Sequence, residues 1–437
     1  MDTFWRSTQL GVIALGGFII NVLFARYFST EQFALWALAF SFLFTFSLFG
    51  DFGLGATIAK FTSQYNSTDK ELLPSLITTG LANLILNCAG IYIIILITAP
   101  VIGFLLEKPD LTILLMIGGI YVISKIEFEF MSEFFRGFQI FKIPALTLGL
   151  CTAIETACYI VLIYRYTNIT LLEIFLIRCG FWTAKGIILA LLFYRFIKSK
   201  DITIRPSLFC PNLFVNLTKF SLPIGISLIS WYLYTKVDII LVAAFSQEME
   251  IARYTVAENI FICPLLIPAA FAAVISPKAT AYFYSNNHEK LQNLFSLSIT
   301  LIFISMSVIS VFFFVFSKYI LLIFFPKYIS SSIFLKLLAP LIVFKGIEHT
   351  ALAGFLVATG NPKILAKLTV IAAILNVIGD LIMIPPFGAL GAFLVTVIVH
   401  SIYTVFAVRY VTMKLGLKIS LKFPDTMSIK NLLGNRR

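Results

Sequence analysis

The stretch Phe24-Ala25-Arg26-Tyr27-Phe28-Ser29 ends the first long apolar run of the chain, and its last two residues return as Phe245-Ser246. Other positions repeat in the same register, with Asn21 opposite Asp238, Trp36 opposite Tyr254 and Pro144 opposite Pro362. The offset is roughly 218 residues throughout. Because unrelated apolar helices would drift out of register over this distance, we predict two homologous halves. Duplicated halves in a membrane protein are typical of transporters.

Composition places both halves in a membrane. Hydrophobic residues make up 59% of the 437 residues and charged residues 12%, whereas a soluble domain carries about 25% charged residues. No long polar stretch is present from which a soluble domain could form. The six cysteines show no CxxC or Cys/His spacing, and five of them lie in apolar runs, so we expect no metal site and no cofactor.

Apolar runs of about 20 residues predict membrane-spanning helices. They indicate an all-α protein with about twelve spans, near 8–25, 33–56, 76–105, 111–131, 143–165, 171–194, 220–245, 254–280, 292–317, 331–357, 364–385 and 388–410. An even number per half makes both halves enter the membrane in the same direction, which predicts a pseudo-two-fold axis along the membrane normal. The expected parts are an N-terminal lobe (1–195), a cytoplasmic linker (196–219), a C-terminal lobe (220–410) and a basic cytoplasmic tail (411–437).

Lysine and arginine are concentrated in alternate connections, on the side that holds both termini. This asymmetry predicts that both termini are cytoplasmic. The formal net charge of +12 is spread over short membrane-flanking loops, so it indicates contact with membrane lipids and no nucleic-acid partner.

Three stretches carry a resemblance to a known family. The first runs from Phe24 through Trp36 to Phe49-Gly50-Asp51-Phe52-Gly53-Leu54-Gly55. The second runs from Gly360-Asn361-Pro362-Lys363 through Asn376 to Ile384-Pro385-Pro386-Phe387-Gly388-Ala389-Leu390-Gly391-Ala392, and the third is Lys236-Val237-Asp238-Ile239-Ile240-Leu241 followed by Glu248 to Glu258. Together they resemble the polysaccharide-biosynthesis branch of the multidrug/oligosaccharidyl-lipid/polysaccharide (MATE-like) flippase superfamily, most of all the bacterial O-antigen flippases.

The resemblance implies a V-shaped bundle of two six-helix lobes that alternates between inward and outward openings. Its implied substrate is an undecaprenyl-diphosphate-linked oligosaccharide of lipopolysaccharide biosynthesis, carried across the bacterial inner membrane. An O-antigen polymerase and a chain-length regulator are the implied protein partners. Where the family often has Asp-Arg at the start of its seventh helix, this chain has Lys236, Asp238 and Ile239, so the role of the pair stays open.

Charges inside the spans are the candidate functional residues, because each costs about 2.5–3.5 kcal/mol at the bilayer centre. Arg178 and Lys185 lie two helical turns apart on one face, with no acid between them on that face. Three interpretations are open: a cationic wall for the diphosphate, an ion pair with Glu155 on the neighbouring helix, or side chains that extend to the membrane interface.

Lys345, Glu348 and His349 stand at i, i+3 and i+4 and are expected to cluster on one face. They form either a structural network or a group that couples transport to H⁺ or Na⁺, since a carboxylate beside an imidazole titrates near neutral pH. Lys125 and Glu129 are one turn apart and predict an intrahelical ion pair.

Asp238 is a candidate for the transport pathway, because its counterpart Asn21 keeps a polar side chain at the equivalent depth. Lys236 is a second candidate, although its spacing from Asp238 places the two on different faces of a helix. Asp238 and Glu258 are also candidates for ion coupling.

These features predict a flippase for a lipid-linked O-antigen repeat unit rather than an enzyme. A drug/cation antiporter of the same superfamily is the alternative, but it would need a cleft dominated by acids. A membrane-embedded polysaccharide polymerase or ligase would need a large external loop, and the outward connections are short.

Overall fold

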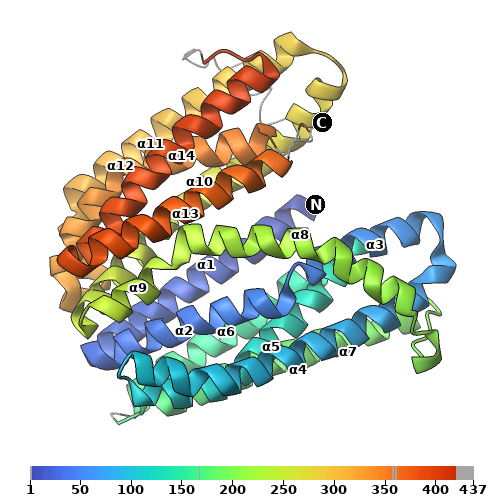
Figure 1. Ribbon diagram of the computed structural model, residues 1–437, viewed down its shortest axis with the longest axis horizontal. Coiled ribbons are helices and arrows are strands. Elements are labelled where there is room, and N and C mark those ends of the chain that lie inside the picture. The colour runs from blue at the N-terminus through green and yellow to red at the C-terminus, as the bar shows by residue number, and fades with distance from the viewer. Residues whose placement is uncertain (1, 167, 357–358, 360–361, 420–437) are drawn as a thin grey trace. The chain divides into compact units, whose positions relative to one another are not determined.

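The structure is a computed structural model that describes residues 2–166, 168–356, 359 and 362–419. These residues form helices and no strand (Figure 1). Within these ranges, eleven helical segments are long and apolar enough to cross a membrane, and each corresponds to a predicted span. The remaining predicted span, 8–25, lies in the first helix, whose apolar part Gly11–Tyr27 is shorter. The predicted all-α membrane fold is confirmed.

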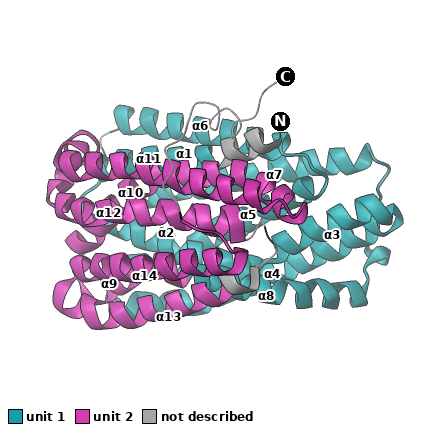
Figure 2. Cartoon of the chain, turned by 90° about the horizontal axis from the view of Figure 1, so that it is seen from above, with its two compact units in different colours: residues 1–232 teal, residues 233–437 magenta. Residues whose placement is uncertain are grey.

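The chain divides into two compact units, residues 1–232 and 233–437, which Figure 2 shows in different colours. Unit 1 contains α1 (Asp2–Tyr27), α2 (Thr30–Asp51), α3 (Leu54–Thr68), α4 (Leu73–Leu105), α5 (Pro109–Gly137), α6 (Lys142–Arg165), α7 (Leu171–Lys198) and most of α8 (Pro211–Lys236). Unit 2 contains the end of α8, then α9 (Asp238–Phe245), α10 (Glu248–Tyr284), α11 (His288–Phe324), α12 (Ser332–His349), α13 (Pro362–Phe387) and α14 (Ala389–Leu415). A π-helical segment, Thr350–Leu356, continues α12, and short 3₁₀ turns occur at Lys70–Leu72, Pro206–Leu208 and Pro326–Ser331.

Each unit is held together by pairs of long apolar helices. In unit 1, α5 is the central helix and packs against α2, α3, α4 and α7, while α1 packs on α6. In unit 2, α12 packs against α10, α11 and α14, and α13 packs against α14. Many aliphatic and aromatic side chains remain exposed on the helix surfaces, as expected for helices that face lipid.

Two predicted spans are interrupted, and hydropathy does not reveal either break. The predicted span 33–56 ends its first helix at Asp51, because Phe52 (φ 40°) and Gly53 (φ 78°) adopt left-handed backbone conformations. A side chain at Gly53 would lie 2.8 Å from the Ser221 carbonyl oxygen, so glycine also allows α8 to approach closely. The predicted span 220–245 is interrupted at Val237, where α8 ends and α9 begins.

The division between the units falls near the end of α8, later in the chain than the predicted linker 196–219. Most of α8 belongs to unit 1, and hydrogen bonds link it and the turn before it to the preceding helices. The Tyr232 hydroxyl bonds to Ser41, the Asn83 amide donates to Thr218, and the Cys210 amide donates to Thr79. The predicted lobe boundaries remain a prediction about which parts move. Of the predicted tail 411–437, residues 420–437 lie outside the described part of the chain, as do Gly360 and Asn361 of the family motif.

Candidate functional site

Unit 1 contains a buried ionic cluster in which one acid faces two bases. Glu155 on α6 is completely buried, and its Oε1 accepts from the Arg178 guanidinium at 2.6 Å. Its Oε2 accepts from the Lys185 ammonium at 2.6 Å, and that lysine is also buried. Because residues 178 and 185 are two turns apart on α7, one carboxylate on α6 can reach both. The ion pair with Glu155, one of the interpretations left open by the sequence, is therefore present, and the cluster keeps an excess formal charge of one.

Aromatic rings and a hydroxyl complete this cluster, which we call the cationic cluster (Glu155, Tyr159, Arg178, Lys185). The Tyr159 hydroxyl lies 3.3 Å from Glu155 Oε1. Rings offer their negative faces to both bases, with Phe40 5.6 Å from the Arg178 guanidinium carbon and Trp182 4.7 Å from the Lys185 nitrogen. Within the described residues, Arg178 Nε and Trp182 Nε1 are buried donors without an acceptor. An anion would find unused donors here.

A neutral hydrogen bond joins the first two helices of unit 1. Trp36 Nε1 on α2 donates to Asn21 Oδ1 on α1 at 3.2 Å. The rings of Phe24 and Phe175 pack edge-on against the Trp36 ring. Asn21 is thus held at the aromatic wall beside α7, but no ion pair involves it.

Unit 2 contains a buried cluster of oxygen groups around Asp238, the first residue of α9. Asp238 Oδ2 accepts from the Tyr254 hydroxyl at 3.0 Å and from the Thr396 hydroxyl at 2.7 Å. The carboxyl of Asp380 on α13 lies close enough to that of Asp238 for the two to interact electrostatically, and both residues are buried. With its amide nitrogen turned toward Asp238, Asn376 donates to Asp238 Oδ1 at 3.1 Å and to the Leu233 carbonyl at 3.2 Å.

This carboxyl cluster (Asp238, Tyr254, Asn376, Asp380, Thr396) contains no basic side chain. Two ionised carboxylates in one buried site repel each other, so a proton or a cation shared between them is favoured. Asp380 Oδ1 is buried without a partner among the described residues. With the amide of Asn376 reversed, its oxygen would face the same centre as the carboxyls. The arrangement can therefore hold either a shared proton or a small hard cation that prefers oxygen ligands.

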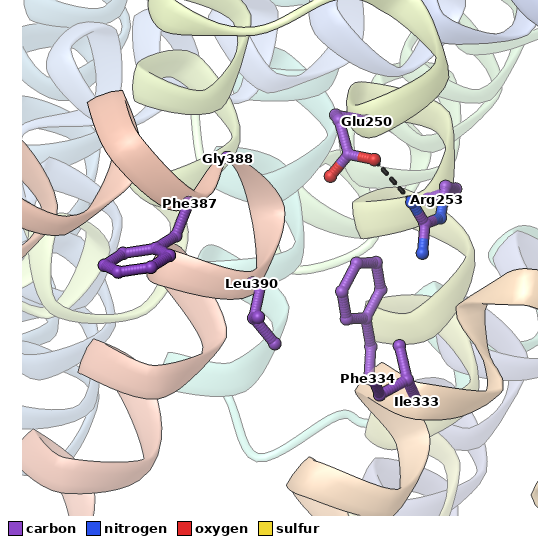
Figure 3. A pocket seen from close by; sticks show the side chains of 7 residues that line it. All are labelled: Glu250, Arg253, Ile333, Phe334, Phe387, Gly388 and Leu390. Atoms are coloured by element: carbon purple, nitrogen blue, oxygen red, sulfur yellow. Dashed lines mark hydrogen bonds and ion pairs between the residues drawn. The ribbon is translucent and has the colours of Figure 1, made fainter.

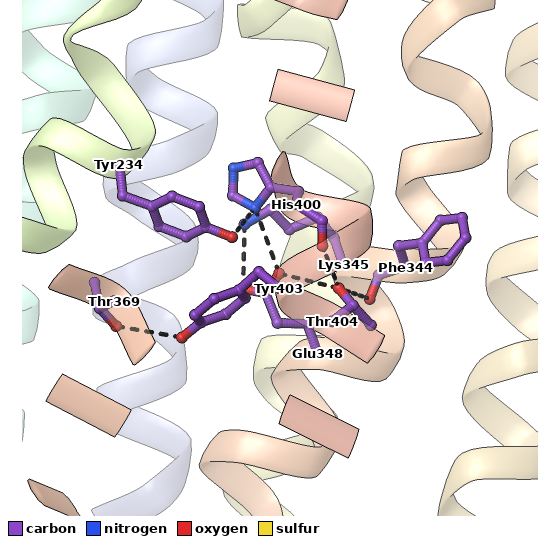
Figure 4. A network of polar contacts seen from close by, with 8 residues as sticks. All are labelled: Tyr234, Phe344, Lys345, Glu348, Thr369, His400, Tyr403 and Thr404. Atoms are coloured by element: carbon purple, nitrogen blue, oxygen red, sulfur yellow. Dashed lines mark hydrogen bonds and ion pairs between the residues drawn. The ribbon is translucent and has the colours of Figure 1, made fainter. Parts of the chain in front are cut away.

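A second polar network in unit 2 joins side chains of α8, α12 and α14 (Figure 4). Glu348 on α12 pairs with Lys345 at 3.2 Å and with His400 Nδ1 on α14 at 3.5 Å, and the Tyr234 hydroxyl bonds to the same imidazole nitrogen. Tyr234 precedes Asp238 by one turn, and His400 follows Thr396 by one turn, so the two groups are consecutive layers. The expected contact of Glu348 with Lys345 is present, whereas His349 makes none of these bonds.

Lys236 lies apart from Asp238, as their spacing predicts. Its ammonium bonds to Glu258 Oε1 at 2.5 Å, and both side chains are partly exposed. The pathway candidate Lys236 and the ion-coupling candidate Glu258 therefore neutralise each other. The Lys125–Glu129 pair predicted on α5 is confirmed at 2.8 Å.

Two pockets outside these clusters are lined by charged side chains, most of which form ion pairs with each other or with a neighbour. A pocket of about 360 Å³ in unit 2 is lined by Glu250, Arg253, Phe334 and Phe387 (Figure 3). Arg253 bonds to Glu250 at 2.5 Å, and its guanidinium lies 4.7 Å from the Phe334 ring. A pocket of about 350 Å³ in unit 1 is lined by acids, by Arg136 and by Trp182. Among the described residues, no group of three or more His, Cys, Asp or Glu side chains is arranged to hold a metal ion.

Comparison with known proteins shows the family to which the chain belongs. Residues 1–283 match the model of the family described as polysaccharide biosynthesis protein, and residues 223–382 match that of the MatE family. The chain belongs to the polysaccharide biosynthesis protein family. One relative of this polysaccharide biosynthesis protein is the "Probable low-salt glycan biosynthesis flippase Agl15" of Haloferax volcanii, which is 25% identical to it over 222 residues. That match covers 50% of this chain and 46% of the relative, so it spans about half the relative's length.

Solved structures confirm the MATE-like fold of this polysaccharide biosynthesis protein. A multidrug resistance MATE family transporter of the MOP superfamily, in an inward-facing conformation, is 15% identical with a TM-score of 0.76, covering 95% of both chains. The lipid II flippase MurJ is 20% identical with a TM-score of 0.72, covering 98% of this chain and 89% of that one. At these identities the likeness concerns the fold alone.

Sequence reasoning placed Arg178, Lys185 and Asp238 among the candidates but did not assemble the groups around them. The missing partners lie on other helices, and contacts between helices cannot be predicted from spacing along one helix. These partners are Asn376 and Asp380 on α13 and Thr396 and His400 on α14. Two signals were available. Asn376 lies inside the second family-like stretch, and Thr396 follows Arg178 at the spacing of the internal repeat, roughly 218 residues.

Proposed function

We propose that this protein is a flippase that carries an undecaprenyl-diphosphate-linked O-antigen repeat unit across the bacterial inner membrane by alternating access. It would act as a transporter without catalytic residues, with both termini in the cytoplasm. The observation that carries the proposal is the buried excess of positive charge in the cationic cluster of a polysaccharide biosynthesis protein. The similarity to a glycan biosynthesis flippase supports the same substrate class.

A diphosphate fits the cationic cluster for electrostatic reasons. Glu155 neutralises one base, so one positive charge remains in a medium where an uncompensated charge is costly. Arg178 is the base with an unused donor, and a guanidinium binds phosphate oxygens through its planar set of N–H groups. A phosphate that reached Arg178 would supply both the missing charge and the missing acceptor.

The carboxyl cluster would couple transport to a cation. Two buried carboxyls without a basic partner cannot both be ionised unless they bind a cation, so the cluster exchanges between a protonated or cation-bound state and an empty state. Na⁺ and H⁺ both fit a set of oxygen ligands. This cluster is also the feature that favours the alternative, a drug/cation antiporter, whereas the positive charge buried in unit 1 disfavours a cationic cargo.

The sharpest test removes the excess charge and leaves the ion pair. Arg178→Gln keeps Glu155 bonded to Lys185, so we expect normal protein levels in the membrane but at least a tenfold loss of transport, as for a lost contact of about 1.4 kcal/mol or more to an ionised group. Transport is measured in a strain that lacks the native gene, by the accumulation of complete undecaprenyl-linked repeat units on the inner leaflet. Lys318→Gln, which removes an exposed base at the end of α11, is the matched control.

The same experiment separates the competing functions. A strain without the protein that accumulates complete units on the inner leaflet supports a flippase. Single units that accumulate on the outer leaflet would indicate a polymerase, and an unchanged lipid profile with increased drug sensitivity would indicate the antiporter. Full activity of the Arg178→Gln variant would refute the role given to the cationic cluster.

Membrane orientation needs a separate measurement. Single cysteines at Lys200 and Lys108, introduced into a cysteine-free background, would be labelled by a membrane-impermeant maleimide from opposite sides. We expect labelling at position 108 in intact cells and at position 200 only after permeabilisation of the inner membrane. The reverse pattern would overturn the cytoplasmic placement of the termini.

A further inference from the structure

In unit 2, α11, α12 and α14 lie side by side (Figure 1), and side chains of all three line an apolar groove. Its volume is about 520 Å³, and we call it the α11/α12/α14 groove. The groove is lined by seven apolar side chains and three polar ones: Ile299, Phe303, Phe344, Ile347, Val405, Val408 and Ile419, and Thr404, Arg409 and Thr412. Phe303 and Val405 are both exposed. The groove therefore offers a hydrocarbon-binding surface on helices that span the membrane.

One end of the groove is built by a segment that folds back after α14. Gly416 adopts φ 63° and ends the helix, and Leu417 beyond it is buried. Gln292 on α11 then fixes Lys418 through two bonds of 2.7 Å, accepting from its amide and donating to its carbonyl. This double hydrogen bond holds Ile419 at the groove, so the shape of this end does not depend on apolar contacts alone.

The same end of the groove carries positive charge. Arg409 is exposed and forms no ion pair with any residue that the structure describes. It lies six residues before the end of α14, which is about 9 Å along the helix axis, the depth at which a long basic side chain reaches the lipid headgroups. Lys414 and Lys418 follow it, while the adjacent first turn of α11 adds one acid and one base, Glu289 and Lys290. The net charge of these side chains is therefore positive.

We propose that the α11/α12/α14 groove binds an anionic phospholipid of the surrounding membrane, with one acyl chain along the apolar lining and the phosphate at Arg409. The complementarity is twofold. A hydrocarbon chain covers apolar side chains that water would not solvate, and a phosphate supplies the negative charge that Arg409 lacks. The site is separate from the cationic and carboxyl clusters, and it does not depend on the identity of the transported substrate.

The test compares lipids that differ only in headgroup charge. The full chain is purified from nanodiscs that contain equal amounts of phosphatidylglycerol and phosphatidylcholine, and retained lipid is counted by native mass spectrometry. We expect phosphatidylglycerol to be retained preferentially by the unaltered protein. Arg409→Gln should lower that retention about fivefold, the effect of one basic residue near an anionic lipid surface. Lys318→Gln, an exposed base elsewhere on α11, should change nothing.

A second variant tests the chain-binding part of the groove. Val405→Phe places a larger side chain at an exposed lining position, so it should lower retention of both lipids without a change in the thermal unfolding midpoint. Equal retention of the two lipids by the unaltered protein would overturn the proposal, as would unchanged retention in both variants. Exclusive retention of an added undecaprenyl phosphate, with no phosphatidylglycerol, would also overturn it, because the groove would then serve the transported lipid.

Discussion

The cationic cluster of unit 1 and the carboxyl cluster of unit 2 carry opposite charge, although the repeat predicted from the sequence relates Arg178 of the first to Thr396 of the second. Asn21 and Asp238 are repeat partners, and each accepts a hydrogen bond from the aromatic partner Trp36 or Tyr254. If the predicted repeat is correct, each half keeps a polar contact at this position while the charges around it differ.

This difference suggests a division of labour. A buried excess of base attracts an anionic group, whereas buried acids without a base take up a proton or a cation. In a transporter the first property suits the cargo and the second suits the coupling ion. Variants that exchange or remove these charges should therefore affect the two clusters in different ways.

The largest expected effect is on the stability of unit 1. Glu155→Gln leaves two buried bases without a counter-charge, so we expect a loss of about 3–5 kcal/mol in the free energy of unfolding. Thermal unfolding of the detergent-purified protein, followed by size-exclusion chromatography, measures the loss. Adding Lys185→Met to Glu155→Gln removes one of the stranded charges and should recover part of it. Equal stability of Glu155→Gln and the unaltered protein would mean that the cluster is hydrated rather than buried.

The second effect concerns the response of unit 2 to cations. If the carboxyl cluster binds Na⁺, a concentration one hundred times the dissociation constant should stabilise the protein by about 2.7 kcal/mol. We expect this stabilisation to vanish in Asp238→Asn and Asp380→Asn and to persist in Arg178→Gln. Thermal unfolding in NaCl and in choline chloride at constant ionic strength provides the comparison.

A stabilisation that appears only on acidification, with no difference between the two salts, would identify the proton as the ion. An unaltered protein that responds to neither condition would exclude the cluster from coupling. Either result keeps the unit 1 proposal intact, since Arg178 and the carboxyl cluster belong to different units.

The sequence predicts the membrane fold well because span length is set by bilayer thickness, which hydropathy reads directly. It does not predict the break at Val237, because the apolar run continues through the interruption. Charged residues such as Arg178 and Asp238 could also be predicted as functional candidates, because a charge stands out within a long apolar run. Their partners could not, since the proximity of Asp238 to Asp380 depends on how α9 and α13 pack, and one sequence contains no record of that contact.

The smallest expected effect is a difference in unfolding free energy between two variants, each of which removes one tyrosine hydroxyl from one cluster. Tyr254→Phe removes a donor from Asp238, which has no basic partner, whereas Tyr159→Phe removes a donor from Glu155, which keeps two ion pairs. A typical hydrogen bond contributes about 0.5–1.5 kcal/mol and one to a charged group about 1.5–3 kcal/mol. The charge of Glu155 stays compensated by Arg178 and Lys185 when the Tyr159 hydroxyl is removed, so the loss there falls at the lower end. We therefore expect Tyr254→Phe to lower the unfolding free energy by about 2 kcal/mol and Tyr159→Phe by about half as much. Both variants lose one oxygen atom from a buried ring, so packing is matched and the difference reports the electrostatic environment. If Tyr159→Phe is the more damaging of the two, the bases of unit 1 do not satisfy Glu155, and the contrast between the clusters is weaker than their charges suggest.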